Sequence, residues 1–453
     1  MKIEGKQVLI VGLGRSGLTA ARFLKRRGAV LTIADTASES QLGNAVDRVK
    51  DMGIGLELGG HRTASFTRTD LIVLSPGVPH TLAPIEAARK KGISVIGEFE
   101  LASRFIREPI IGVTGTNGKT TTTSLLKEML EKSGKSVFVG GNIGNPLIGY
   151  VDNPEPAEWV VAEVSSFQLD TIDTFRPKIG LLLNISEDHL DRYDNFKAYG
   201  RSKGRMFMNQ QRGDIAILNG SDPMIPAVTQ KIKSQKWRFN RDSAKGPGAS
   251  AYGHEIRFHT EDFSERLLLD PSRLSVSGGH NRDNIAAAAL ATLAAGGSMA
   301  GIRSAIETFR GLPHRLEHVT TRDGVRYVND SKATNVDAVA KALTAFEAPI
   351  VLLMGGRDKG GDFNQIRDRI RRHVKHLVLF GEAAPVLETA LGRIKPTETV
   401  STMDSAILCA QSAAVSGDVV LLSPGCTSFD QFQSYVKRGE AFAKTVTDSG
   451  GDL

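Results

Sequence analysis

The sequence predicts an α/β protein with three domains. Its 453 residues suit about three domains of ~150 residues each. Short apolar runs that end in glycine turns recur along the whole chain, and stretches with helical apolar spacing separate them. This alternation is typical of parallel sheets covered by helices. We place the domains at 1–108, 109–311 and 312–453.

The first domain begins with a strand, a glycine turn, a helix and a second strand. The strand 7–11 leads into the Gly-x-Gly-x-x-Gly turn at 12–17, and the second strand, 30–35, ends in Asp35. This is the dinucleotide fingerprint of a Rossmann-like domain, and taken alone it predicts NAD. The same βαβ unit can hold another anionic nucleotide, so the fold does not fix the ligand.

The central domain begins with a strand at 110–113, a loop of sequence Thr-Gly-Thr-Asn-Gly-Lys-Thr at 114–120, and a helix. Backbone N–H groups of such a loop, together with a helix N-terminus, bind phosphate. Lys119 adds a charge near the terminal phosphates, and the Thr120 hydroxyl can contact magnesium. Position 113 is valine where a strict P-loop has glycine. We therefore predict a mononucleotide-binding domain of the P-loop type with a variant loop; the alternative is a glycine-rich turn with an exposed lysine.

Polar residues follow two further apolar strands of the central domain. Glu163 is the one acid in the buried strand 159–164, and His189 follows the strand 179–185. Ligands collect at the carboxyl ends of parallel strands, so both are candidate metal or metal-water ligands. A capping or surface role for His189, and a solvated surface position for Lys203, are the alternatives. The stretch 278–284 opens an alanine-rich helix at 285–295, and its Asn281 and Asn284 either cap that helix or face a nucleotide.

The last domain repeats the strand–glycine turn–helix plan. Candidate strands begin near 327, 350, 376 and 418, and each ends in a polar or glycine-rich turn. This pattern predicts a second Rossmann-like domain. The glycine at 311 and the proline at 313 mark a hinge on which this domain closes over the central one.

Composition limits the function classes. The net charge of +7 is spread along the chain without a basic stripe that carries aromatic residues, so we expect anionic small-molecule substrates and no nucleic acid. The two cysteines, Cys409 and Cys426, lack metal-type spacing and predict free thiols in a reducing compartment. No signal peptide or membrane-length apolar run is found, so we expect a cytoplasmic protein without membrane insertion. We also expect a monomer.

Six stretches together resemble the Mur ligases of peptidoglycan precursor synthesis, and the resemblance covers the whole chain. They are 114–120, 163–168, 184–189, 280–281, 313–315 and 329–335. The stretches 355–359 and 423–432 look like the branch of the family that adds D-glutamate.

The resemblance implies a reaction and its cofactors. ATP would phosphorylate the carboxylate of UDP-N-acetylmuramoyl-L-alanine, and the amine of D-glutamate would attack the acyl phosphate. Two Mg²⁺ ions would neutralise the crowded anions.

The resemblance also implies roles for particular residues. The catalytic residues would be Lys119, His189, Lys203 and Lys332. ATP would contact Gly115, Thr116, Asn117, Gly118, Lys119, Thr120, Thr121, Asn281, Arg315 and Asp330. The metal ligands would be Thr120, Glu163, His189 and Lys203, the last as a carbamate. The UDP-substrate would contact Arg15, Ser16, Asp35, Thr36, Ser75, Asn142 and Gln168. D-Glutamate would contact Thr334, Lys359, Ser428 and Tyr435, the last at a position where the family commonly has phenylalanine.

Three other classes remain as alternatives. A folylpolyglutamate synthetase type of amide ligase shares the phosphate loop, and its acceptor would distinguish it. A non-catalytic nucleotide-binding protein is expected to lack Glu163, His189 or Lys203, and all three are present. A dehydrogenase would bind reduced nicotinamide.

Overall fold

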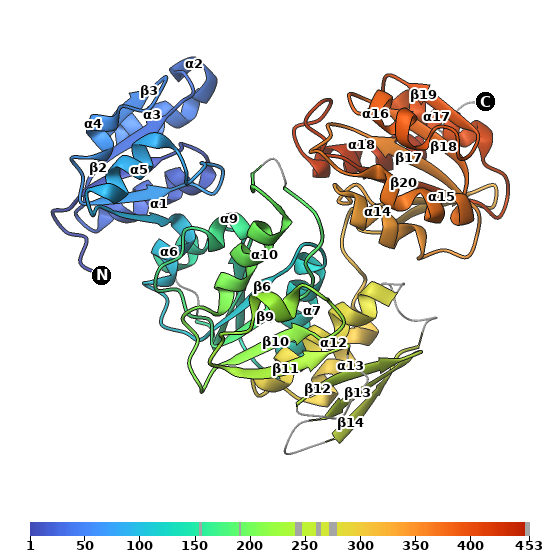
Figure 1. Ribbon diagram of the computed structural model, residues 1–453, viewed down its shortest axis with the longest axis horizontal. Helices are drawn as coiled ribbons and strands as arrows, with labels where there is room; N and C mark the ends of the chain where they lie inside the picture. Colours follow the sequence, from blue (N-terminus) through green and yellow to red (C-terminus); the bar gives the residue numbers. More distant parts are fainter. Residues whose placement is uncertain (154–155, 190–191, 241–246, 260–263, 271–278, 449–453) are drawn as a thin grey trace.

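The computed structural model describes residues 1–153, 156–189, 192–240, 247–259, 264–270 and 279–448. Leu190, Asp191, Gly278 and parts of the stretch 234–275 lie outside these ranges. The described chain forms three α/β units, each built on its own sheet of five, nine or six strands (Figure 1). The predicted three-domain α/β fold is confirmed, whereas the exact domain limits stay a prediction.

The N-terminal unit is a five-stranded parallel sheet with the order β3-β2-β1-β4-β5. This is the order of a Rossmann-like half-fold, with the glycine turn after its central strand β1. Apolar side chains pack on both faces of the sheet. The strands are β1 (Gln7–Val11), β2 (Val30–Asp35), β3 (Gly55–Leu58), β4 (Leu71–Leu74) and β5 (Ser94–Gly97). The helices are α1 (Arg15–Arg26), α2 (Glu39–Leu42), α3 (Asn44–Asp51), α4 (Thr63–Phe66), α5 (Ala83–Lys90) and α6 (Glu98–Ser103).

The central unit is a nine-stranded sheet with the order β14-β13-β12-β11-β10-β9-β6-β8-β7. Strand β6 lies between β8 and β9, and all three run parallel, so their carboxyl ends meet at one edge. The last three strands pair antiparallel. The strands are β6 (Ile110–Thr114), β7 (Val137–Gly141), β8 (Trp159–Glu163), β9 (Ile179–Leu182), β10 (Ile215–Asn219), β11 (Gln235–Phe239), β12 (Gly248–Tyr252), β13 (Glu255–His259) and β14 (Ser264–Leu268).

Helices α7, α12 and α13 pack against one another and contribute to one apolar core of this sheet. Helix α12 begins at Gly279, so Asn281 and Asn284 lie within it and the predicted capping role is wrong. The long helices are α7 (Lys119–Lys132), α10 (Phe196–Gly204), α12 (Gly279–Ala294) and α13 (Met299–Thr308). Shorter ones are α8 (Leu147–Asp152), α9 (Ser166–Leu169), η1 (Arg205–Phe207) and α11 (Ile225–Val228).

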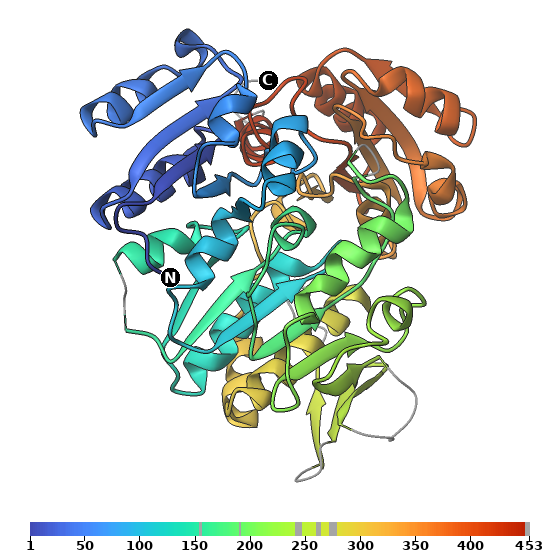
Figure 2. The same ribbon diagram turned by 60° about the vertical axis from the view of Figure 1, so that its left-hand side comes forward.

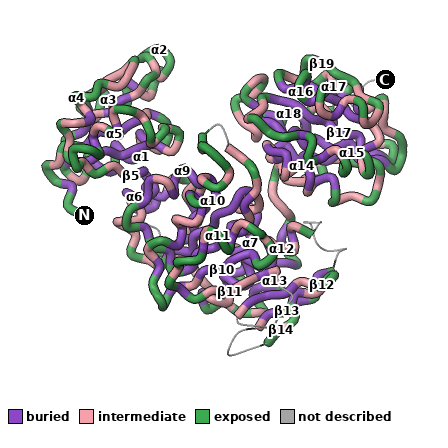
Figure 3. The backbone as a smooth tube through the Cα atoms, in the orientation of Figure 1, coloured by how far each residue is buried: buried purple, intermediate pink, exposed green. Residues whose placement is uncertain are grey.

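The C-terminal unit is a six-stranded sheet with the order β15-β16-β20-β17-β18-β19, parallel except for β15. Its central strands are buried between two apolar layers (Figure 3). The strands are β15 (Glu317–Arg322), β16 (Val325–Asn329), β17 (Ile350–Gly355), β18 (Val374–Phe380), β19 (Thr397–Val400) and β20 (Val419–Gly425). The helices are α14 (Val336–Leu343), η2 (Phe363–Ile366), α15 (Arg367–His373), α16 (Ala384–Leu391), α17 (Met403–Ala413) and α18 (Tyr435–Asp448). Cys409 and Cys426 are free thiols, as predicted.

The N-terminal and central units share one apolar core. Phe99 of α6 packs edge-on against Phe175 of the central unit, with ring centroids 4.8 Å apart. Beside it, the buried Glu100 carboxylate accepts hydrogen bonds from the backbone N–H groups of Asp173, Thr174 and Phe175, at 2.9 to 3.0 Å. These contacts fasten α6 to the central sheet.

In the part of the chain that the structure describes, the C-terminal unit is joined to the central one by polar contacts and not by a shared apolar core. Both outer units lie on the same side of the central one (Figures 1 and 2), but none of the apolar cores of the described residues spans the central and C-terminal sheets. The connection at 311–316 contains three residues with left-handed backbone, Gly311 (φ 81°), His314 (φ 63°) and Leu316 (φ 44°). Side-chain hydrogen bonds and an ion pair, described below, hold the two units together.

Candidate active site

A cavity of about 570 Å³ lies between the central and C-terminal units, at the carboxyl ends of β6, β8 and β9. Most of the residues predicted for nucleotide, metal and amino acid line it. They are Thr116, Asn117, Gly118, Lys119, Thr120, Thr121, Asn142, Glu163, His189, Asn281, Arg315, Asp330, Lys332, Thr334, Lys359, Ser428 and Tyr435. The fold thus brings together side chains that are up to 319 positions apart (435 minus 116).

The loop after β6 is held in a defined shape. Gly118 has left-handed backbone (φ 87°), and a Cβ there would come within 2.3 Å of Asn284 Oδ1. Only glycine therefore fits the position without displacing Asn284. The side chain of Asn184 accepts from Asn117 N at 2.8 Å and donates to Asn117 O at 2.9 Å. The loop leads directly into the N-terminus of α7, whose free backbone N–H groups are suited to an anion.

Two lysine ammonium groups share one acceptor in this loop. Lys119 Nζ and Lys203 Nζ donate to Gly115 O at 2.8 and 2.9 Å. Burial lowers the pKa of Lys119 to about 8. Burial and the Lys119 charge together lower the pKa of Lys203 well below its ordinary value. Lys203 is only 1% exposed, so its interpretation as a solvated lysine is wrong.

Glu163 offers an unsatisfied oxygen to the cavity. Its Oε1 accepts from Asn142 Nδ2 at 2.8 Å, whereas the buried Oε2 has no hydrogen-bond partner. A buried carboxylate oxygen without a donor is costly, and a bound cation would remove that cost. The described residues contain no group of three or more His, Cys, Asp and Glu side chains that could hold a metal. A metal here would therefore need the Thr120 hydroxyl and non-protein oxygens as further ligands.

His189 follows β9 and lines both cavities between the central and C-terminal units. It has left-handed backbone (φ 55°), and its ring meets the Phe167 ring edge-on at 4.7 Å. Its own backbone N–H donates to the Asp188 carboxylate at 2.9 Å. The structure places His189 in the cavity, and its role as a metal ligand stays a prediction.

The C-terminal unit contributes a second set of charged residues to the cavity: Arg315, Asp330 and Lys332. Burial raises the pKa of Asp330 to about 7, although Ser423 Oγ donates to its Oδ2 at 2.9 Å and Leu316 N to its Oδ1 at 3.3 Å. Lys332 Nζ lies 3.7 Å from the centroid of the Tyr435 ring. Burial and the neighbouring Arg315 charge lower the pKa of Lys332 to about 8. Arg315 and Lys332 thus bring positive charge to a cavity that already holds Lys119.

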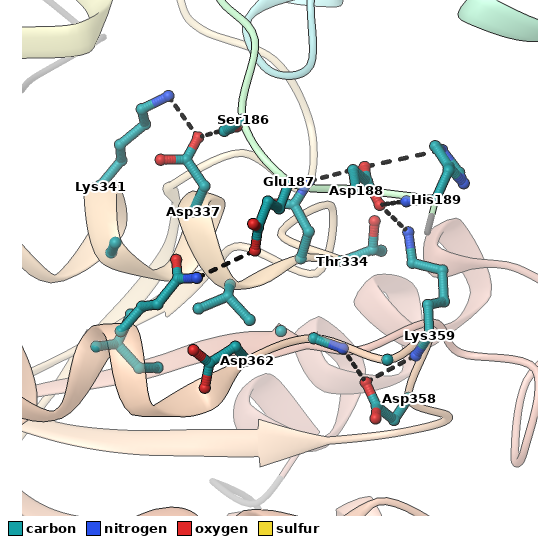
Figure 4. A pocket seen from close by; sticks show the side chains of 18 of the residues that line it. Ser186, Glu187, Asp188, His189, Thr334, Asp337, Lys341, Asp358, Lys359 and Asp362 are labelled. Carbon is teal, nitrogen blue, oxygen red and sulfur yellow. Dashed lines mark hydrogen bonds and ion pairs between the residues drawn. The ribbon is translucent and has the colours of Figure 1, made fainter. Parts of the chain in front are cut away.

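Two of the four residues predicted to bind D-glutamate border a side cavity of about 240 Å³ (Figure 4). Thr334 and Lys359 line both cavities, whereas Ser428 and Tyr435 line the larger one. Lys359 Nζ is paired with Asp188 Oδ1 at 2.7 Å. Burial alone would raise the pKa of Asp188, but the Lys359 charge and its hydrogen bonds hold it at about 2. Asp188 therefore presents a carboxylate to Lys359 where the prediction places a substrate carboxylate.

Most of the predicted UDP-substrate residues lie outside the large cavity. Asp35 is engaged by the turn after β1, because its carboxylate accepts from Leu13 N at 2.7 Å and Ala37 N at 2.9 Å. Arg15 donates to Asn145 Oδ1 of the central unit at 2.5 Å. The remaining positions are Ser16 in the first turn of α1, the exposed Thr36 after β2, and Ser75 and Gln168, which line a small pocket between the two units.

The sequence prediction missed several side chains that shape the site. Asn184 and Asp188 stood in a stretch that we singled out, but neither was given a role. Arg438 of α18 is fully buried and donates to Ser331 and to backbone carbonyls beside the cavity. A single arginine in a helical stretch carries no sequence signal of burial, so only the fold identifies it.

Comparison with known proteins places this site in a family. Three family models match the chain: the Mur ligase MurD-like N-terminal domain at 6–97, the Mur ligase middle domain at 113–292, and the Mur ligase glutamate ligase domain at 314–426. The chain belongs to the Mur ligase family.

Individual relatives are more specific. The chain is 50% identical to UDP-N-acetylmuramoylalanine--D-glutamate ligase of Desulfatibacillum aliphaticivorans, over 98% of this chain and 99% of the relative. It is 49% identical to the protein of the same name of Desulfosudis oleivorans, over 98% and 97%. The solved structure of MurF ligase of Thermotoga maritima in complex with ADP superposes with a TM-score of 0.62 at 17% identity, over 99% and 96% of the two chains, which shows the shared fold.

Proposed function

We propose that this chain is an ATP-dependent ligase that joins D-glutamate to UDP-N-acetylmuramoyl-L-alanine in peptidoglycan precursor synthesis. One observation carries the proposal: the phosphate loop with Lys119 faces Lys332, Thr334 and Lys359 of another unit across a single cavity. Such an arrangement suits a reaction between a triphosphate and two carboxylate-bearing substrates. The relatives that are half identical over nearly the whole chain carry the name of this activity.

The reaction has two steps. The carboxylate oxygen of the L-alanyl group attacks the γ-phosphorus of ATP, and ADP leaves. The amine of D-glutamate then attacks the acyl-phosphate carbon, and the tetrahedral intermediate collapses to the amide, releasing phosphate and a proton. Activation is needed because a free carboxylate is a poor electrophile, whereas phosphate is a good leaving group.

The proposed roles at the nucleotide end follow from charge and position. Lys119 and the backbone of Gly115, Thr116, Asn117, Gly118, Thr120 and Thr121 bind the phosphates, while Asn281, Arg315 and Asp330 bind the nucleoside part. The unpartnered Glu163 Oε2, the Thr120 hydroxyl and His189 are suitable to hold Mg²⁺, and we propose two ions. Bound Mg²⁺ would neutralise the phosphates and stabilise charge on the leaving oxygen.

Lys203 suits conversion to a carbamate. A neutral amine attacks carbon dioxide, and the lowered pKa of Lys203 favours that form. The product is an anion, so it would add oxygen ligands for Mg²⁺ where the protein itself provides few. It would also replace the repulsion between Lys203 and Lys119 by attraction.

The acceptor and the third substrate occupy the remaining surfaces. Lys359, Thr334, Ser428 and Tyr435 would hold D-glutamate, and Lys332 would lie by the transferring phosphoryl group. Arg15, Ser16, Asp35, Thr36, Ser75, Asn142 and Gln168 would bind the UDP-substrate along the boundary of the N-terminal and central units. We place these functions in domains 1–108, 109–311 and 312–453.

We further propose that the chain acts as a cytoplasmic monomer on small molecules, without nucleic acid. The described residues form no helix that could cross a membrane. Sedimentation velocity of the purified chain at one monomer mass would support the monomer, and a concentration-dependent dimer would contradict it.

The test is phosphate release with ATP, Mg²⁺ and UDP-N-acetylmuramoyl-L-alanine in bicarbonate buffer. Separate reactions receive D-glutamate, L-glutamate, meso-diaminopimelate or no acceptor. Release that requires D-glutamate is the expected result. Release with another acceptor would assign the chain to a different ligase, and no release with any acceptor would refute the proposal. Lys119→Met is the matched inactive control, because it removes the cation at the phosphates.

A further inference from the structure

The first turn of α14 bridges the C-terminal unit and the phosphate loop. Asp337, in this turn, accepts three hydrogen bonds on one oxygen, Oδ2. The donors are Asn117 Nδ2 at 2.7 Å, Ser186 Oγ at 2.9 Å and Lys341 Nζ at 2.7 Å. Figure 4 shows Asp337 between Ser186 and Lys341. Asn117 and Ser186 belong to the central unit, and Asn117 is part of the phosphate loop. Lys341 belongs to α14 itself.

The two donors in the central unit are themselves tied to that loop. The main chain of Asn117 is fixed by both ends of the Asn184 amide, which leaves its side chain to reach Asp337. Ser186 N donates to Thr116 Oγ1 at 3.0 Å. The carboxylate of Asp337 therefore contacts the phosphate loop directly through Asn117 and indirectly through Ser186 and Thr116.

Few other side-chain contacts fix the C-terminal unit to the central one. Asn335, the N-cap of α14, donates to Asp188 Oδ2 at 3.0 Å, and Lys359 pairs with Asp188. Asn335 also exchanges two longer side-chain bonds with Asn117, at 3.4 and 3.5 Å. Gln365 donates to the exposed Glu187 at 3.1 Å. The proposed binding of an acceptor carboxylate would engage Lys359 and compete with its ion pair. Asp337 has no proposed substrate contact, so its bonds can persist through the reaction.

We propose that Asp337 is a positioning residue that couples the phosphate loop to the docking of the C-terminal domain. A nucleotide bound at the loop would hold the Asn117 side chain where it reaches Asp337, and so it would favour the docked arrangement that presents Lys332, Thr334 and Lys359. Coupling between binding and docking is reciprocal, so loss of Asp337 weakens both. Lys341 neutralises the carboxylate, which limits its repulsion of nearby phosphates. The inference rests on the proposed nucleotide binding and deepens it.

The experiment measures docking without turnover. Dyes are attached to Leu268→Cys of β14 and Val415→Cys beside β20, both highly exposed, in a Cys409→Ser background, and energy transfer is followed with a non-hydrolysable ATP analogue and Mg²⁺. In the labelled chain with Asp337 intact, binding of the analogue should shift the C-terminal domain toward the docked state. Asp337→Ala should lower the docking equilibrium constant roughly tenfold, because the two bonds that its carboxylate accepts across the boundary, from Asn117 and Ser186, are lost. The affinity for the analogue should fall with it.

Two comparisons separate coupling from general loss of contact. Gln365→Ala removes an exposed hydrogen bond at the same boundary that does not touch the loop, and it should change docking less than twofold. Ser186→Ala and Asp337→Ala should be non-additive when combined, because they remove the same bond. Asp337→Asn, which keeps an acceptor oxygen, should restore part of the docking.

Three results would overturn the inference: equal effects of Asp337→Ala and Gln365→Ala, additive effects of Ser186→Ala and Asp337→Ala, or docking that does not respond to the analogue in the chain with Asp337 intact. The proposed function fails separately. A chain that docks on nucleotide but releases no phosphate with D-glutamate would refute the D-glutamate ligase and leave the role of Asp337 intact.

Discussion

Arg438 joins the carboxyl ends of three strands of the C-terminal sheet, and replacing it tests how that sheet holds its loops. Its guanidinium donates to Ser331 O at 2.9 Å, Ser331 Oγ at 3.0 Å and Cys426 O at 3.1 Å, with longer bonds to Thr427 O and Gly355 O. Ser331 follows β16, Cys426 and Thr427 follow β20, and Gly355 is the last residue of β17. The same loops carry Lys332, Thr334 and Ser428.

The magnitude follows from the acceptors that Arg438→Met would leave without a donor. Each of the three shorter bonds contributes about 1 kcal/mol or more when its loss strands a buried acceptor. The C-terminal domain should therefore lose at least ~3 kcal/mol, which corresponds to a fall of about 10 °C in its melting temperature. Arg438→Lys should lose less, because it keeps the charge but not the planar set of donors.

Differential scanning calorimetry of the full chain measures this effect. Lys437→Met is the matched control: Lys437 is 62% exposed and pairs with the exposed Glu440, so its loss should cost less than about 1 kcal/mol. A fall of less than 2 °C for Arg438→Met, or an equal fall for both variants, would refute the reasoning.

Three further predictions concern the cavity. Glu163→Gln should raise the Mg²⁺ concentration for half-maximal phosphate release at least about tenfold, while Glu158→Gln, at the exposed position just before the same strand, should not. Incubation with ¹³C-labelled bicarbonate should give a carbamate resonance in ¹³C NMR that Lys203→Arg abolishes; a resonance that persists would contradict the assignment. The pKa of about 7 for Asp330, against ~3.9 in an unfolded chain, means that between these values the folded state keeps a proton that the unfolded state has lost. The contribution of Asp330 to stability should therefore fall as pH rises from 4 to 7, by at most ~1.4 kcal/mol per unit. Asp330→Asn should remove this contribution in denaturant titrations of the nucleotide-free chain, while that of Glu98, whose pKa burial also raises to about 7, should remain.

The sequence predicted the parts of the fold that local patterns encode. The phosphate loop was found because strand, glycines, lysine and helix are adjacent in the chain. Most of the central strands were found because they are buried on both faces and read as continuous apolar runs. Strand β10 (Ile215–Asn219) was missed although it is a buried apolar run inside the central sheet. Strands β3, β15 and β19 were missed because each lies at a sheet edge with most of its side chains partly exposed, which leaves no apolar run.

The site shows the same division. Lys203 reads as a surface lysine in its own helix, and only the packing of α10 against the loop after β6 buries it. The resemblance to a known family singled it out, whereas composition did not. Asp337 and Arg438 lie in segments that any helix could contain. The partners of Asp337 in the central unit are 151 and 220 residues away, and Ser331 is 107 residues from Arg438, so no local pattern could predict these contacts.

The shared core beneath α6 has a consequence for how the chain divides. Phe99 and Glu100 are fastened into the central sheet, so cutting near residue 108 would expose apolar surface on both fragments. Cutting the connection at 311–316 would separate two pieces that each keep their own apolar layers. The unit of folding therefore differs from the unit of substrate binding: two of the three binding domains form one body, and limited proteolysis should release a C-terminal fragment well before an N-terminal one.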